Sequence, residues 1–297
     1  MQEHYDTEFA WEKEFQLLPA DKLSVKGLNV FGHVHRSKAF RPIDEHYHPN
    51  CMEVTVIVEG NQKYLANGTE YSIFGGEAFT TFVNEAHSSG EHPQAVNEIY
   101  WFQLDMSEMR GFLALQEPWD AKLFHKLKEW HQRTVKVSKE EVDLLRKSFA
   151  YFSKREIEGK DFHLQGYSFF LTFLVGMLEK TDSCSEMTHD IQKVMEFINL
   201  HIEEQIYIEE LANLSGLSVT HLKKKFRQQI GISPREYINL RKVEQAKEML
   251  KNASGSVTEI AYTLQFGSSN YFASVFKQFA GCSPSEYREY CTNSSKI

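Results

Sequence analysis

Hydrophobic and polar positions alternate through the first hundred residues in the way expected of β-strands. Valine occupies every second position at 54, 56 and 58, and Gly60-Asn61 follows as a predicted turn. Asn67-Gly68 is a strong hairpin signal. Short strands separated by frequent turns are typical of a sandwich or barrel. The predicted strands cover residues 53–59, 63–66, 70–74, 78–83 and 98–104.

Beyond Trp119 the apolar residues recur with the period of a helix. The longest apolar stretch without a charge, residues 162–178, includes His163, Gln165, Ser168 and Thr172, which favours a buried helix over a membrane span. Three predicted helix faces consist of Leu123, Leu127 and Trp130; of Val142, Leu145, Phe149 and Phe152; and of Phe162, Phe169, Phe173 and Met177.

The last hundred residues contain an internal repeat, in which one pattern returns after about fifty residues. Each copy predicts a short helix (208–215; 257–264), a turn with Gly216 or Gly267, and a second helix after a serine N-cap, Ser218 or Ser268. Two helices joined by a tight turn form a helix-turn-helix, whose second helix can enter the DNA major groove. The repeated positions are Ser218, Leu222, Phe226, Gly231, Ser233, Pro234, Glu236 and Tyr237, matched by Ser268, Phe272, Phe276, Gly281, Ser283, Pro284, Glu286 and Tyr287.

Each copy is followed by Ser-Pro-x-Glu, at Ser233 and at Ser283, which is a capping box with proline at the first helical position. The first box predicts a helix to about Leu250, roughly 25 Å long. Such a helix would place the two second helices roughly one DNA turn, about 34 Å, apart. One chain would then read two successive major grooves.

The outward positions of the two second helices carry groups that suit DNA. Lysine and arginine suit phosphates and guanine edges, Asn270 suits adenine, and Ala273 suits a thymine methyl group. A pair of plain helical hairpins with a solvated lysine run is the alternative, and the repeated caps, turns and core spacing argue against it. The predicted DNA-binding residues are Val219, Thr220, Lys223, Lys224, Arg227, Ser269, Asn270, Ala273, Ser274 and Lys277.

Residues 190–290 resemble the DNA-binding domain of AraC/XylS transcription regulators, most clearly from Ile260 to Arg288. The resemblance implies base contacts from Thr220, Lys223 and Lys224 and from Ser269, Asn270 and Ser274. Gln265 stands where a small residue is frequent. Ser274 replaces a frequent arginine, which implies weaker base readout by the second unit.

A cluster of candidate ligand residues, three histidines and one glutamate, lies in the first half of the chain. His46 and His48 alternate along a strand, Glu53 follows, and His87 comes from a later strand, which together suit a divalent metal. Two other interpretations stay open: a polar pocket for a small organic ligand, and a hydrogen-bonded structural cluster.

The spacing of this cluster resembles the two motifs of the cupin barrel, over residues 25–105. Phe40 stands where the first motif has glycine, and Val83 where the second has proline. Cupin domains of AraC-like regulators commonly hold a sugar or another effector. By this resemblance the effector-binding residues are His35, His46, His48, Glu53, Tyr64, His87 and Trp101, with Tyr100 as a further wall.

The net charge of −8, taken alone, argues against DNA, but it is unevenly distributed. Residues 1–187 hold 20 basic and 29 acidic groups, a net −9, whereas residues 188–297 hold 13 and 12, a net +1. The four cysteines lie far apart, and no secretory signal is visible, so we expect the protein in the reducing cytoplasm, with its cysteines as free thiols.

We therefore predict an α+β chain with an N-terminal cupin-like β-barrel, then helices, then an all-α C-terminal domain. The expected domains are a sensor at 1–118, a helical region at 119–180 and a DNA-binding domain at 188–297, with a linker at 181–190. The helix-turn-helix units are expected at about 207–230 and 256–280. The resemblance implies that the helical region dimerises, and the alternative is that it packs on the barrel; the residues concerned are Phe169, Leu171, Phe173, Leu174 and Leu178.

The expected function is a transcription regulator that responds to a small molecule, with carbohydrate as the favoured class. Expected partners are promoter DNA, RNA polymerase and a second copy of the chain, with no membrane, no required cofactor and a possible divalent metal. The rivals are a metal-dependent cupin enzyme with a DNA-binding appendage and a regulator without a ligand.

Overall fold

The computed structural model describes residues 2–3, 9–158, 163–180, 188–252 and 255–294. Contacts divide the chain into two compact units, which we call the N-terminal unit (residues 1–35, 43–90 and 97–185) and the C-terminal unit (36–42, 91–96 and 186–297). Phe162 and most of the predicted linker at 181–190 lie outside the described residues. The three domain boundaries drawn from the sequence stay predictions.

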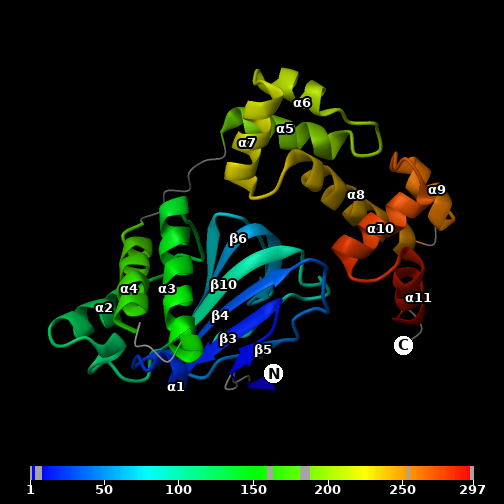
Figure 1. Cartoon of the computed structure of the whole chain (residues 1–297). Helices are drawn as coiled ribbons and strands as arrows, with labels where there is room; N and C mark the ends of the chain where they lie inside the picture. Colours follow the sequence, from blue (N-terminus) through cyan, green and yellow to red (C-terminus); the bar gives the residue numbers. More distant parts are fainter. Residues whose placement is uncertain (1, 4–8, 159–162, 181–187, 253–254, 295–297) are drawn as a thin grey trace. The chain divides into compact units, whose positions relative to one another are not determined.

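A curled sheet forms a half-barrel in the N-terminal unit, which confirms the predicted fold class (Figure 1). Its main path runs β1-β5-β9-β6-β10-β4-β3-β2, and β7 and β8 also pair with β6. The strands are β1 (Gln2–Glu3), β2 (Ala10–Trp11), β3 (Phe15–Pro19), β4 (Leu28–Arg36), β5 (His46–Tyr47), β6 (Cys51–Ala66), β7 (Thr69–Phe74), β8 (Glu77–Thr81), β9 (His87–Ser88), β10 (Asn97–Asp105) and β11 (Thr134–Lys136).

The long strand β6 corrects one prediction and confirms another. Gly60-Asn61 is not a turn, because Gly60 lies inside β6 with φ of +85°, at the last position that pairs with β10. Glycine adopts that left-handed conformation without a steric cost, so it bends the strand instead of ending it. Asn67 and Gly68 have φ of +50° and +73°, as the predicted hairpin turn requires.

The two faces of the sheet have different coverings. Alternate residues of β10, including Tyr100 and Phe102, join one core with the helices α2 (Trp119–Lys128), α3 (Lys139–Glu158) and α4 (His163–Leu178). The other face carries Ile99 and Trp101. The short helices α1 (Ala20–Leu23) and η1 (Phe112–Ala114) complete the unit.

The predicted dimer face is largely part of this core. Phe173, Leu174 and Leu178 are buried within the N-terminal unit, so they are not available to a second chain. Phe169 and Leu171 are half-buried. Packing of the helices on the barrel, the alternative left open by the sequence, therefore accounts for most of these residues.

An ion pair joins α3 to β10 and predicts acid sensitivity. Burial by itself would raise the pKa of Glu98, but the nearby His33 and the hydrogen bonds from Arg146 hold it at about 2. The Arg146 Nη2 to Glu98 Oε2 distance is 2.8 Å. Because this pKa is lowered on folding, the ionised carboxylate stabilises the fold above its unfolded pKa, and that stability is lost as the pH falls toward 2.

Between pH 5 and pH 3 the N-terminal unit should therefore lose about 2 kcal/mol of unfolding free energy that Glu98→Gln does not lose. Urea titrations followed by tryptophan fluorescence measure this, because all four tryptophans (11, 101, 119 and 130) belong to this unit. Parallel pH profiles for the two proteins would contradict the assignment.

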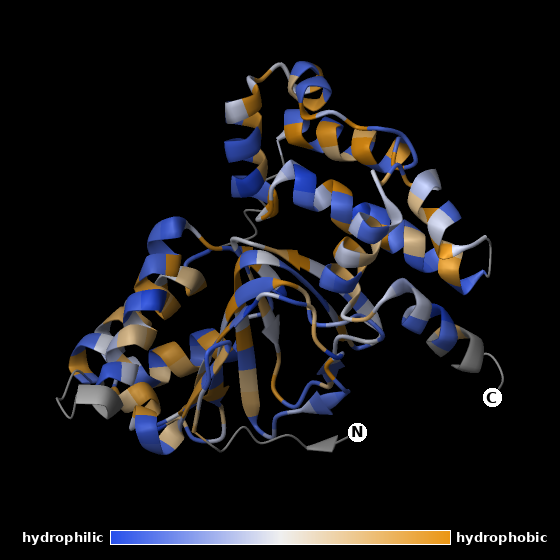
Figure 2. Ribbon diagram, turned by 45° about the vertical axis from the view of Figure 1, so that its right-hand side comes forward, coloured by the Kyte–Doolittle hydropathy of each residue, from blue (hydrophilic) through white to orange (hydrophobic). Residues whose placement is uncertain are grey.

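The C-terminal unit is helical, as predicted, and Figure 2 shows hydrophobic and hydrophilic residues mixed along its helices. The serine caps are present: Ser218 accepts a hydrogen bond from the His221 amide (3.3 Å), and Ser268 from the Tyr271 amide (3.1 Å). Both capping boxes form, at Ser233 and Ser283. The helices are α5 (His189–Leu200), α6 (Ile208–Ser215), α7 (Val219–Ile230), α8 (Pro234–Lys251), α9 (Val257–Thr263), α10 (Ser269–Ala280) and α11 (Pro284–Ser294).

Helix α8 packs against both helix-turn-helix units. Its C-terminal half contributes Val243, Ala246 and Leu250 to the core that contains Phe272 and Phe276 of α10. The two helix-turn-helix units therefore share one continuous helix of 18 residues.

The turns of the two helix-turn-helix units differ at one backbone position. Gly216 adopts a φ of +68°, and its counterpart in the second turn is Gln265, with a φ of +54°, whereas Gly267 is not left-handed. A side chain in this conformation is strained. Gln265→Gly should therefore raise the unfolding free energy of the C-terminal unit by about 1 kcal/mol.

Gly216→Gln is the matched control and should lower that free energy by a similar amount, because a Cβ there meets no atom within 4 Å and only the backbone strain is added. Denaturation followed by far-ultraviolet circular dichroism compares the two variants with the wild type. A change of the same sign in both would contradict the explanation.

Candidate DNA interface and ligand site

The outward faces of α7 and α10 carry the residues predicted to bind DNA. Leu222 and Phe226 of α7 are buried, as are Phe272 and Phe276 of α10, which turns the opposite side of each helix outward. The exposed residues are Thr220, Lys223, Lys224, Arg227, Asn270, Ser274 and Lys277, and the half-buried ones are Val219, Ser269 and Ala273.

Lys225 differs from the other basic residues of α7. Its Nζ lies 2.6 Å from Oδ2 of Asp190 in α5, and the lysine is half-buried. Burial would raise the pKa of Asp190, but the hydrogen bond from Lys225 helps to hold it at about 2. Lys225 therefore joins α5 to α7, and we do not place it among the DNA-facing residues.

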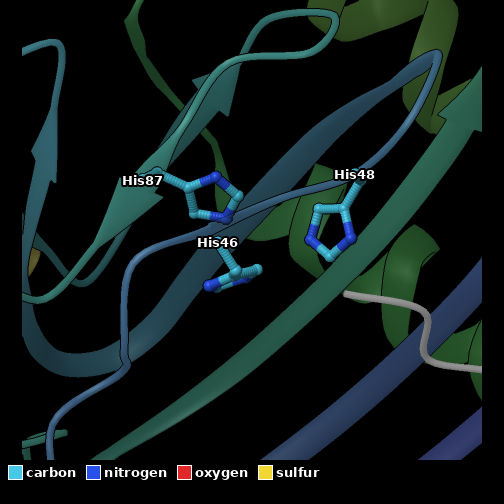
Figure 3. A group of neighbouring side chains, drawn as sticks. All are labelled: His46, His48 and His87. Carbon is cyan, nitrogen blue, oxygen red and sulfur yellow. The ribbon is translucent and has the colours of Figure 1, made fainter. Parts of the chain in front are cut away.

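The structure brings together the four predicted metal-ligand residues. His46 of β5 faces His87 of β9 as a paired position, His48 follows β5, and Glu53 belongs to β6. The rings of His46 and His48, from one segment, lie close to that of His87, from another (Figure 3), with one nitrogen of each within 4.8 Å of the others. Glu53 Oε2 lies 3.2 Å from His48 Nε2, and Oε1 lies 3.5 Å from His87 Nε2.

Comparisons with known proteins cover both halves of the chain. A family model described as an AraC-like ligand binding domain matches residues 31–134, and one described as a helix-turn-helix domain matches residues 211–290. The HTH-type transcriptional activator RhaS of Salmonella schwarzengrund and that of Salmonella typhimurium are each 23% identical over 252 residues, which cover 82% of this chain and 87% of the relative.

The chain belongs to the AraC/XylS family of transcription regulators.

It is accordingly a DNA-binding regulator with a ligand-binding N-terminal domain. Among solved structures, the DNA-binding domain of AdpA in complex with a target DNA is 26% identical and covers 37% of this chain and 98% of its own, with a TM-score of 0.35. ToxT from Vibrio cholerae O395 is 16% identical and covers 95% and 99%, with a TM-score of 0.33. Within the described residues, no helix is long and apolar enough to span a membrane.

The predicted effector residues of this AraC/XylS regulator fall into two groups. Tyr64 and Trp101 belong to the apolar cluster on the sheet face that also carries Glu53, with Tyr64 stacked on Phe79 at 4.7 Å between ring centroids. His35 is a correction, because it is exposed, and alternation along β4 turns it toward the face of His33 instead. Tyr100 is also on that opposite face, stacked on His33.

The structure adds Gln103, which sequence reasoning missed. Its position on β10 pairs with Glu53, and its amide donates a hydrogen bond to Glu53 Oε2 at 3.0 Å. The same nitrogen lies 3.2 Å from His48 Nε2. Only the strand register brings Gln103 here, and no local pattern signals it.

The charge state of the cluster follows from its burial. Burial would raise the pKa of Glu53, but His48 and His87 hold it well below its usual value, so the carboxylate is ionised. Burial and the nearby His87 lower the pKa of His46, so this ring is neutral at neutral pH. The cluster therefore combines an ionised carboxylate with imidazole and amide groups, which suits a polar ligand that forms hydrogen bonds.

Proposed function

We propose that α7 and α10 are the DNA-reading helices of this regulator, inserted in two successive major grooves. The observation that carries this proposal is the repeated geometry: in each unit a serine cap begins a helix whose buried Leu/Phe or Phe/Phe pair leaves the opposite side exposed. The mixed surface of α7, with Lys223, Lys224 and Arg227, suits phosphates and guanine, whereas α10 offers Asn270 to adenine.

Hydroxyl-radical footprinting on DNA selected from a random pool tests this arrangement. We expect two protected segments on one face of the duplex, about one helical turn apart for each bound chain. A single protected segment would contradict the use of both units.

For the sensor, we propose a polar small molecule as effector, with a carbohydrate as the favoured class. Trp101 stands beside hydrogen-bonding side chains on the same sheet face, since Thr55 pairs with Trp101 and Glu53 with Gln103 in adjacent rows. An aromatic ring next to several polar groups suits a polyhydroxylated ligand.

A tryptophan-fluorescence and thermal-shift screen of sugars tests the effector class. A ligand that binds should shift the melting temperature of the N-terminal unit, and it should alter DNA affinity if it favours one arrangement of the two units. A sensor that responds to no compound would support the regulator without a ligand.

We further propose that the regulator acts as a homodimer in the cytoplasm, contacts RNA polymerase and has no catalytic activity. The relatives are transcription regulators, which supports the last point. For the dimer, α4 offers an apolar surface to a second chain, made of half-buried Phe169 and Leu171 and exposed Leu164 and Val175. Substrate turnover by the metal-loaded protein would instead favour the cupin enzyme.

A further inference from the structure

We propose that a two-stranded ribbon in the sensor sequence regulates the second DNA-reading helix, α10. The ribbon consists of residues 39–46, which end in β5, and residues 87–94, which begin in β9. This inference rests on the proposed function, because it assigns the route by which an occupied sensor acts on a helix that reads DNA. The route is the same whichever compound the sensor binds.

Backbone hydrogen bonds hold the two strands of the ribbon together. Ile43 donates its amide to Ser89 Oγ at 2.8 Å, and its carbonyl accepts from the Ser89 amide at 3.1 Å. Further along, Phe40 and Gln94 exchange both of their backbone hydrogen bonds, at 2.9 and 3.0 Å. The pairing is antiparallel, so a shift of one strand carries the other with it.

One end of the ribbon lies in the candidate ligand site. His46 and His87 form the next cross-strand pair, with 4.3 Å between their ring centroids. Oε1 of Glu53 lies 3.5 Å from Nε2 of His87. A polar ligand that contacts both rings therefore acts on both strands of the ribbon.

The other end of the ribbon caps α10. Residues 36–42 and 91–96 belong to the C-terminal unit, together with α10. An α-helix leaves its last four carbonyl groups without partners inside the helix. In α10 the Ala39 amide donates a hydrogen bond to the Gln278 carbonyl at 3.0 Å. A residue from the sensor sequence therefore satisfies one of the terminal carbonyls of this helix.

Ala39 also packs against the turn that ends α10. Gly281 adopts a φ of +80°, and a Cβ there would lie 3.4 Å from the Ala39 carbonyl oxygen and 3.7 Å from the Ala39 Cβ. Ala39 is buried, whereas its neighbours Lys38 and Phe40 are exposed. The contact is made by a small side chain and by backbone, so a larger side chain at position 39 displaces the ribbon.

These contacts couple the ligand site to α10. A ligand that favours one geometry of the His46–His87 pair favours one arrangement of the ribbon, and so one arrangement of the helix that the ribbon caps. Coupling of this kind is reciprocal. DNA bound to α10 must therefore act on the ribbon with the same coupling free energy, even when no effector is present.

Hydrogen exchange tests this reciprocity with DNA as the only ligand. The full chain is mixed with duplex DNA selected from a random pool, and the Ser89 amide, inside the ribbon, is compared with the Asp105 amide, which donates to Gly27 outside it. We expect DNA to change the exchange rate of Ser89 by about fivefold or more and to leave that of Asp105 unchanged.

Two glutamine variants show whether the response passes through position 39. Ala39→Gln should abolish the response of Ser89, because the longer side chain displaces the ribbon from Gly281. Ser37→Gln is the matched control, since it adds the same side chain at an exposed position of the same segment, and it should respond as the wild type does.

The outcomes separate this inference from the proposed function. DNA that binds without changing the exchange of Ser89, or that changes it equally in Ala39→Gln, would overturn the role of the ribbon and leave the DNA-reading role intact. A wild-type protein that binds no selected DNA would contradict the proposed function, and the role of the ribbon with it.

A disulfide tests the same contact in a way that does not depend on the glutamine variants. The 3.7 Å separation of the two Cβ positions at 39 and 281 suits a disulfide. With the four native cysteines replaced by alanine, Ala39→Cys combined with Gly281→Cys should cross-link under mild oxidation, and Ser37→Cys combined with Gly281→Cys should cross-link far less.

The cross-linked protein then reports on DNA affinity. Its oxidised and reduced forms share the same substitutions, including the strain of a side chain at position 281, so they differ only in whether the ribbon is fixed to α10. We expect their affinities for the selected DNA, measured by mobility shift, to differ by about fivefold or more. A bond that does not form, or equal affinities in the two forms, would overturn the proposal.

Discussion

Replacing Lys223 and Lys224 with alanine should abolish specific DNA binding while the protein remains folded. Both side chains are exposed on α7, opposite the buried Leu222 and Phe226, so their removal leaves the core intact. Removing one base-reading side chain costs about 1–3 kcal/mol, so the double variant should bind selected DNA at least about a hundredfold more weakly. Mobility-shift titrations at several salt concentrations measure both the affinity and its salt dependence.

Lys225→Ala is the matched control on the same helix. Because Lys225 pairs with Asp190, its loss should lower the stability of the C-terminal unit and change DNA affinity only a few-fold. Unchanged affinity in the double variant, or an equal loss in Lys225→Ala, would show that this side of α7 does not read DNA.

Gly32→Ala should destabilise the N-terminal unit by about 3 kcal/mol or more. A Cβ built on Gly32 would lie 2.2 Å from Cζ2 of Trp101, far inside contact distance. The Trp101 ring also packs near Phe15, with 5.6 Å between ring centroids, so it has little room to retreat. Urea denaturation followed by fluorescence measures the destabilisation.

Two further proteins test its cause. Gly176→Ala adds the same methyl group in α4, where the nearest atom, Glu141 Oε1, is 3.6 Å away, and it should stabilise the helix by up to about 1 kcal/mol. Combining Gly32→Ala with Trp101→Leu should restore much of the stability, because the clash is removed. Additive destabilisation in the combined variant would exclude steric conflict with Trp101 as the cause.

The C-terminal unit was largely predictable because its signals are local. A serine cap acts on an amide three residues away, as at Ser218 and Ser268, and buried residues four positions apart share a helix face. The strained Gln265 was harder to assign. The sequence placed Gly267 in the second turn, but the left-handed residue of that turn is Gln265.

The fold of the N-terminal unit was predicted in outline. The errors in that prediction concern contacts between residues that are distant in sequence. Gly60 looked like a turn because the sequence does not show that β6 continues through it, paired with β10 up to Gly60 and with β7 from Asn61 onward. The cluster of His46, His48, His87 and Glu53 followed from spacing, but Gln103 depends on the register of β10, and the misplacement of His35 depends on which face of β4 is covered. One contact of the C-terminal unit is also non-local, because Asp190, the partner of Lys225, lies 35 residues away in sequence.

Helix α8 has a consequence for how binding sites evolve. Because it is a single continuous helix in contact with both reading units, adding one residue would rotate one unit by about 100° and shift it by about 1.5 Å relative to the other. The relative orientation and spacing of the two helix-turn-helix units are therefore fixed by the number of residues in α8, not by any one side chain. With α7 and α10 in the proposed DNA-reading roles, substitutions on them would change which bases are preferred, while the operator spacing would stay constant until α8 itself changes length.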